Sequence, residues 1–148
     1  MKRFNWRLER VLEIKKKQEQ KERAELFELT ERLAERRAEL LMRQKTLKDM
    51  IRGLAEADPE QRLADQEFFL RHSGTSDEQI RRLEHQVGEL ETRQQEKIAN
   101  VLKIRRLKEG LEKLRAEAKR RFIEEQEKLD QKELDETATI SFVRKALS

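Results

Sequence analysis

Apolar residues recur along this chain with the period of a helix that packs along one narrow stripe. Between residues 76 and about 137 they return every three or four positions, which predicts one long helix. The helix opens with a capping box, because the Ser76 hydroxyl can accept a hydrogen bond from the Gln79 amide and the Gln79 side chain can reach back. At 1.5 Å per residue such a helix is about 90 Å long and requires a partner of similar length. Its stripe comprises Ile80, Leu83, Val87, Leu90, Ile98, Val101, Ile104, Leu107, Leu111, Leu114, Ala118, Phe122 and Leu129.

The first third of the chain supplies that partner. A helix is predicted over about 5–57, with two apolar stretches separated by the wholly polar residues 15–23. We expect the contact between the helices to be loose beside this polar segment, because only one of them offers apolar side chains there. The apolar positions are Phe4, Leu8, Val11 and Leu12 before the segment, and Leu26, Leu29, Leu33, Leu40, Leu47, Met50, Ile51 and Leu54 after it.

A connector containing a short helix is predicted between the two long helices. Pro59 cannot continue the first helix, but it suits the first position of a new one, with Asp58 as N-cap. The new helix covers about 59–71 and ends at a turn made by Ser73, Gly74 and Thr75. Such a compact connector folds two long helices back as an antiparallel pair.

The predicted fold is therefore all-α: a long antiparallel two-helix coiled-coil hairpin with a short helix in the connector. It forms a single elongated domain over residues 1–148, with helices over about 5–57, 59–71 and 76–137. If Leu54 faces Ile80, the N-terminal residues lie beside Leu129. Residues 138–148 contain several β-branched side chains, and we expect them to fray or to become ordered only against a partner.

Composition agrees with long helices and limits the environment. Charged residues make up 45% of the 148 positions and aromatic residues 5%, and the 35 basic and 31 acidic residues nearly cancel. The absence of cysteine excludes disulfides and thiol catalysis, and it suits the cytoplasm. No apolar run is long enough to span a membrane, and the basic start is not followed by the apolar segment of a secretion signal.

Charge is unevenly distributed along the chain. Residues 1–24 carry a net charge of +5 and residues 101–122 carry +6, whereas residues 56–92 carry −6 and residues 124–136 carry −5. The basic stretches could contact phosphates or an acidic protein surface, or they could be solvated helix faces. No aromatic side chains alternate with the basic ones, so a platform for stacking bases is not indicated.

Patterns typical of catalysis and metal binding are missing. The sequence has no glycine-rich phosphate loop and no nucleophile or zinc-protease motif, and His72 and His85 lack the spacing of paired metal ligands. The carboxylates are expected on exposed helix faces with basic neighbours, where no pocket perturbs their pKa values. The sequence therefore predicts a binding or scaffold protein with no catalytic residue, no metal, no cofactor and no small-molecule ligand.

Four aromatic side chains lie where a pair of helices cannot cover them fully. Phe4 and Trp6 are at one end of the predicted hairpin, where either the C-terminal segment or a partner covers them. Phe68 and Phe69 are near the turn, where they either pack under the short helix or contact a partner.

Two terminal signatures resemble those of the flagellar export protein FliJ family. They are the start, FNWRLERVL at residues 4–12, and the run LDQKELDETA at residues 129–138. That family has this length, this charge content and a long–short–long arrangement of helices. The resemblance implies a cytoplasmic component that is peripherally associated with the inner membrane at the flagellar base.

The resemblance also implies a set of protein partners. Members form an antiparallel coiled coil similar to the central stalk of rotary ATP synthases. The stalk is held in the pore of the hexameric export ATPase, is associated with the regulator subunit of that ATPase, and links it to the membrane export gate protein. Members also bind the chaperones of late export substrates, and no nucleic acid is expected. A two-helix rod about 20 Å wide can enter the pore of a ring.

Carried over by position, the resemblance assigns two sets of contact residues. The set near the turn that would contact the export gate or another partner is Phe68, Phe69, Ile80 and Leu83. The ATPase-docking set is Phe4, Trp6, Leu8 and Val11 with Leu129, Gln131, Leu134, Asp135 and Glu136.

Two other functions are compatible with the same pattern. The stripe could pair between chains and give a generic dimerising coiled-coil scaffold, which a concentration series by analytical ultracentrifugation distinguishes from a monomeric hairpin. Alternatively, the chain could be a basic hairpin associated with nucleic acid or the ribosome. That binding would weaken steeply with salt, and the acidic residues 56–92 and 124–136 argue against it.

Overall fold

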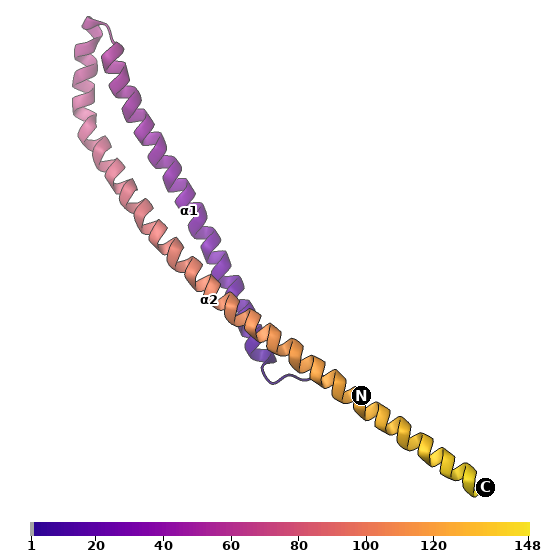
Figure 1. Ribbon diagram of the computed structural model, residues 1–148. Coiled ribbons are helices and arrows are strands. Elements are labelled where there is room, and N and C mark those ends of the chain that lie inside the picture. The colour runs from indigo at the N-terminus through magenta and orange to yellow at the C-terminus, as the bar shows by residue number, and fades with distance from the viewer. Residues whose placement is uncertain (1) are drawn as a thin grey trace. The chain divides into compact units, whose positions relative to one another are not determined.

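Two long α-helices account for almost all of the protein. A computed structural model describes residues 2–148, and in that part of the chain it contains α1 (Glu9–Glu56) and α2 (Pro59–Leu147) and no strand (Figure 1). The all-α class and the packing of two long helices against each other, as in a helical hairpin, are confirmed. Both helices contribute to two compact units, one formed by the described residues up to Glu19 with Lys103–Ser148, the other by Gln20–Leu102.

The chain reverses direction at Ala57 and Asp58, which are the only residues between α1 and α2. The Asp58 carbonyl accepts hydrogen bonds from the backbone N–H groups of Gln61 (3.0 Å) and Arg62 (2.8 Å), so it closes the first turn of α2. Pro59 is the first residue of that helix, where its missing N–H group costs nothing. The predicted role of Pro59 is thus the observed one.

The predicted short helix and second turn are not formed. α2 continues without interruption through Ser73, Gly74 and Thr75, and no described glycine has a positive φ. A single glycine inside a helix costs only about 1 kcal/mol, which packing against α1 outweighs, because Ser76 and Ile80 line the interface with α1. Ser76 is therefore an interior residue and not an N-cap. The helix also includes residues 138–147, for which the sequence predicts fraying or order only against a partner.

The observed register differs from the predicted one. In the unit formed by Gln20–Leu102, the Gln94 amide donates to the Thr30 hydroxyl (3.1 Å) and Arg37 pairs with Glu91 (2.9 Å). The predicted register would have placed Thr30 beside residue 104, about ten residues or 15 Å further along α2. The difference arises because the chain reverses at Ala57 and Asp58 and not after residue 71.

A single line of buried side chains forms the core, as expected for two helices with one shared interface. The buried apolar residues of the Gln20–Leu102 unit are Leu33, Leu83, Val87 and Val101, and Leu12 is the buried apolar residue of the other unit. On α2 they belong to a stripe with alternating steps of three and four residues, which is the pattern of a coiled coil.

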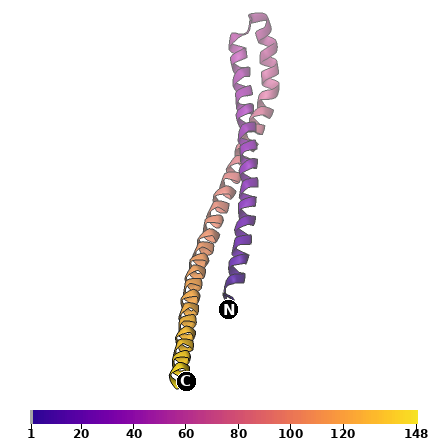
Figure 2. The ribbon, with the colours of Figure 1, turned by 90° about the vertical axis from the view of Figure 1, so that its right-hand side faces the viewer.

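The C-terminal part of α2 has no partner helix. Every residue from 127 to 148 is exposed, and both ribbon views show this part of α2 running past the N-terminal end of the chain by itself (Figures 1 and 2). No described helix is long and apolar enough to cross a membrane.

Candidate docking site

The polar segment of α1 is tied to α2 by ion pairs. In the Gln20–Leu102 unit, the Lys97 ammonium donates to the carboxylates of Glu22 (2.8 Å) and Glu25 (2.5 Å). These hydrogen bonds, to Glu22 first and then to Glu25, raise the pKa of Lys97, and the bond from Lys97 lowers the pKa of Glu25. One lysine thus holds two carboxylates one helical turn apart.

The other unit contains a buried carboxylate. The Glu19 side chain is buried, its residue being only 4% exposed, and its oxygens lie 2.6 Å from Lys108 Nζ and 3.3 Å from Arg105 Nε. The hydrogen bond from Lys108 holds the pKa of Glu19 below its ordinary value, with a smaller contribution in the same direction from Arg105. Near the start of α1, Glu9 pairs with Arg115 at 2.7 Å.

These contacts correct the expectation of a loose interface beside residues 15–23. Glu19 lies seven residues after Leu12 and seven before Leu26, so it occupies a core position of the heptad, and Lys97 and Lys108 occupy the facing stripe of α2. Charge pairing replaces apolar packing at these positions. The lack of apolar residues in this segment suggested a loose contact, although the heptad spacing already places Glu19 on the side of α1 that faces α2.

The N-terminal part of the predicted ATPase-docking set packs against α2. The Phe4 ring lies 5.5 Å from the Phe122 ring, and the Arg115 guanidinium lies 5.6 Å from the centre of Phe4. Phe4, Trp6 and Leu8 are half-buried just before α1, whereas Val11 is exposed. The aromatic start of the chain is thus fixed in place but not fully covered.

The C-terminal part of that set lies further along α2. Phe4 faces Phe122, which precedes the set by seven residues, or about 10 Å of helix. The structure therefore does not bring the two parts together side by side, as the predicted register did. All five C-terminal members are exposed on the unpaired part of α2: Leu129, Gln131, Leu134, Asp135 and Glu136.

The residues predicted to contact a partner near the turn differ in how exposed they are. Leu83 is buried in the interface with α1 and is unavailable to a partner. Phe68 is about half-exposed, and its ring lies 4.3 Å from that of His72. Phe69 is half-buried beside Met50 and Leu54.

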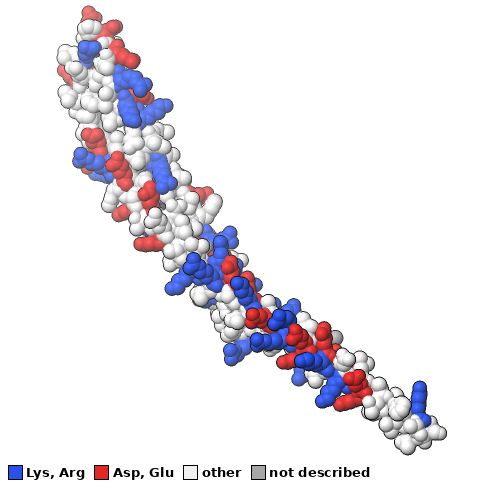
Figure 3. Space-filling model, in the orientation of Figure 1, with Lys and Arg blue, Asp and Glu red and all other residues white. Residues whose placement is uncertain are grey.

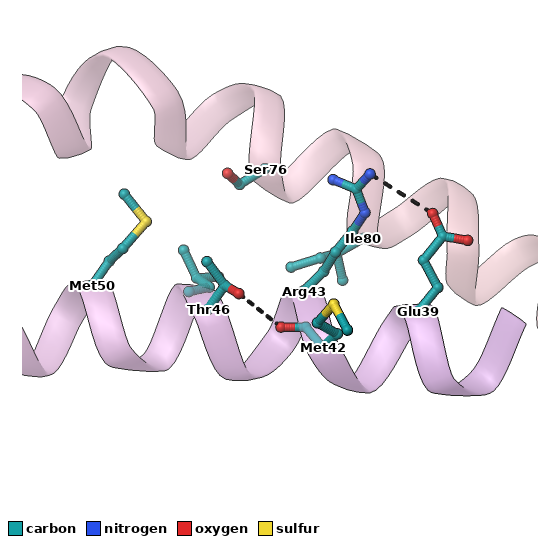
Figure 4. A pocket seen from close by; sticks show the side chains of 8 residues that line it. Glu39, Met42, Arg43, Thr46, Met50, Ser76 and Ile80 are labelled. Carbon is teal, nitrogen blue, oxygen red and sulfur yellow. Dashed lines mark hydrogen bonds and ion pairs between the residues drawn. The ribbon is translucent and has the colours of Figure 1, made fainter. Parts of the chain in front are cut away.

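Ile80 lines a cavity of about 360 Å³ between α1 and α2 (Figure 4). Met42, Leu47 and Met50 give it apolar walls, and the Arg43–Glu39 ion pair lies at its edge. Arg43 also donates to Gln79 on α2. Methionine-lined surfaces adapt to different apolar side chains, so this cavity is a candidate position for a partner's side chain.

Charged side chains of both signs are intermingled over the face shown in Figure 3, and within residues 2–148 no group of three or more potential ligands is arranged to hold a metal ion. The candidate site is the exposed part of α2 together with the aromatic residues at the start of the chain.

Comparison with known proteins gives one result. The family described as "Flagellar FliJ protein" matches residues 4–147, which is nearly the whole chain. No match was found among curated proteins or among solved structures.

Proposed function

We propose a function from one established premise: the chain belongs to the flagellar FliJ protein family. Membership makes it a coiled-coil protein of the flagellar export system, in a family of non-enzymatic, chaperone-like components. The finer proposal is that the chain acts as a stalk, docking in the ring of the export ATPase and coupling it to the export gate.

The unpaired part of α2 carries this proposal. Contact with the N-terminal segment just before α1 reaches Phe122 through Phe4, and from residue 127 onwards every residue is exposed. A single long helix in solution gains little stability without a packed face, so a protein partner would supply that face. Leu129 and Leu134 offer apolar contacts, and Asp135 and Glu136 offer charged ones.

The remaining partners are assigned to other surfaces. We propose that Phe68, Phe69 and Ile80 contact the export gate protein. They lie towards the hairpin end, where Phe68 and Phe69 line one hollow between α1 and α2 and Ile80 lines another. Leu83 is omitted because it is buried. The ATPase regulator subunit and the chaperones of late substrates complete the proposed partners, and the proposed location is the cytoplasmic face of the inner membrane at the flagellar base.

Charge reversal tests the docking end. The double substitution Asp135→Lys with Glu136→Lys should weaken stimulation of the export ATPase at least tenfold, because each lost charge-assisted contact is worth about 1.5–3 kcal/mol. The measurement is ATP hydrolysis by the hexamer at increasing concentrations of the chain, together with swimming motility. Trp6→Ala should reduce stimulation as well.

A matched control has the same change of net charge elsewhere on α2. Glu109→Lys with Glu112→Lys alters two exposed residues in the paired part of the helix, and it should leave ATPase stimulation within about twofold of the unsubstituted chain. Unchanged stimulation by the Asp135/Glu136 variant would show that this end of α2 is not the docking end.

A further inference from the structure

The last three turns of α2 differ chemically from the rest of the helix. Residues 137–148 contain Arg144 and Lys145 and no acidic residue, whereas residues 124–136 carry a net charge of −5. In Figure 3 the C-terminal end of the visible face is mostly uncharged, with basic atoms and no acidic ones at its tip. This segment, the C-terminal tip, is helical to Leu147, and every residue in it is exposed.

The C-terminal tip is amphipathic. At about 100° per residue, Ile140, Val143 and Leu147 lie within about 60° of one another around the helix. Phe142 and Ala146 widen the mainly apolar arc to about 160°, and Thr139 is the one polar residue of the tip inside it. The two largest exposures are those of Phe142 (75%) and Leu147 (84%).

The basic residues flank this apolar arc on both sides. Arg144 lies about 40° beyond Ile140, and Lys145 lies about 60° before Phe142. Long basic side chains at the edges of an apolar face can place their charges among lipid headgroups while their stems follow the apolar face. Thr137, Ser141 and Ser148 occupy the opposite side, which would face water.

A coiled-coil partner fits the C-terminal tip poorly. The stripe that packs on α1 would continue through Leu129, Lys132, Glu136, Thr139 and Val143, so charged or polar residues occupy three of these five positions. Only Val143 and Ala146 remain as apolar stripe positions beyond Glu136, which is too short a stripe for a coiled coil. The apolar arc is also wider than a two-helix interface uses. A flat apolar surface bordered by anions matches this arrangement better.

From these features we infer that the C-terminal tip binds the surface of an anionic lipid bilayer. The apolar arc enters the boundary between headgroups and acyl chains, and Arg144 and Lys145 contact anionic headgroups. The acidic residues nearest to the basic pair, Asp135 and Glu136, lie about 12–15 Å from Arg144 and Lys145 along the helix, which exceeds the Debye length of about 8 Å at physiological salt. Salt therefore weakens their effect on the basic pair, and the contact with lipid is confined to the residues that follow Glu136. This inference does not depend on ATPase docking.

Vesicle co-sedimentation of the full chain tests the inference. The probes are vesicles of phosphatidylglycerol and phosphatidylcholine in equal parts, and vesicles of phosphatidylcholine alone. The chain should bind the anionic vesicles, and binding should weaken as salt is added. Phe142→Asp should reduce that binding at least tenfold, and Arg144→Ala with Lys145→Ala should do the same, since each basic residue contributes about fivefold.

Leu70→Asp is the matched control, because it places the same charge at an equally exposed apolar position (74%) of α2 far from the C-terminal tip. It should bind anionic vesicles as the unsubstituted chain does. The inference is overturned if the unsubstituted chain does not sediment with anionic vesicles, or if Leu70→Asp weakens binding as much as Phe142→Asp.

Two further results would assign the C-terminal tip to a protein and overturn the lipid inference. One is a Phe142→Asp variant that binds vesicles normally but no longer associates with the export ATPase. The other is a dimer of the full chain in analytical ultracentrifugation that Phe142→Asp abolishes while vesicle binding stays unchanged.

Discussion

Replacing Leu33 by alanine is expected to lower the free energy of unfolding by about 2–4 kcal/mol. Leu33 is the most completely buried side chain among the apolar core residues, with 1% of its surface exposed. The core is one residue wide, so few other contacts compensate for a lost leucine. The loss is measured by urea unfolding followed by circular dichroism at the helix band, with the slope of the transition compared between variants.

Leu41→Ala is the matched control for this experiment. Leu41 is the same residue type on the same helix, but it is 66% exposed. Its replacement should change the free energy of unfolding by less than about 0.5 kcal/mol. Equal effects of the two substitutions would contradict the placement of the interface between α1 and α2.

Reversing the charge of Lys108 should destabilise the protein by about 2–3 kcal/mol near neutral pH. Lys108→Glu removes the closest cation from buried Glu19 and adds a second carboxylate beside it. Arg105 still lies beside Glu19 and water reaches the edge of a two-helix interface, so the effect is smaller than in a deep core. Lys113→Glu, which makes the same charge change at an exposed position of α2, should cost less than about 0.5 kcal/mol.

The loss of stability caused by Lys108→Glu should become smaller as the pH falls. Because the folded-state pKa of Glu19 is lowered, its ionised form contributes stability above its ordinary pKa, and that contribution is lost as the pH falls through the lowered value. The difference in unfolding free energy between the unsubstituted chain and Lys108→Glu should therefore be full at pH 7 and shrink below about pH 4.5. A difference that stays constant down to pH 3 would contradict the assigned role of Glu19.

The fold class could be predicted from apolar periodicity, but the details of the turn could not. Pro59 correctly marked the start of a helix, because its geometry suits that position. Ser73, Gly74 and Thr75 look like a turn by residue type, yet they lie inside α2. Placing a glycine inside a helix costs only about 1 kcal/mol. The packing of α2 against α1 therefore decides that these three residues are helical. The error in the turn then shifted the predicted register.

The roles of the candidate site residues stay predictions. The terminal signatures resemble the family whose model matches residues 4–147, and the structure fixes only where those residues lie. The separation of Phe4 from Leu129 follows from the register, which periodicity alone cannot fix, because a stripe repeats every heptad and permits several alignments. The buried position of Leu83 and the pairing of Glu19 likewise depend on which residue faces which.

The central functional claim is that residues 129–136, in the unpaired part of α2, bind the export ATPase. The most direct measurement is a pull-down of the flagellar export ATPase by the full chain and by the chain without residues 129–148. Those residues are all exposed, so the truncated chain should keep its helix pairing and its unfolding transition. The prediction is that the ATPase is the main partner of the full chain and that the truncated chain loses it. Retention of the ATPase by a folded, truncated chain would contradict the claim.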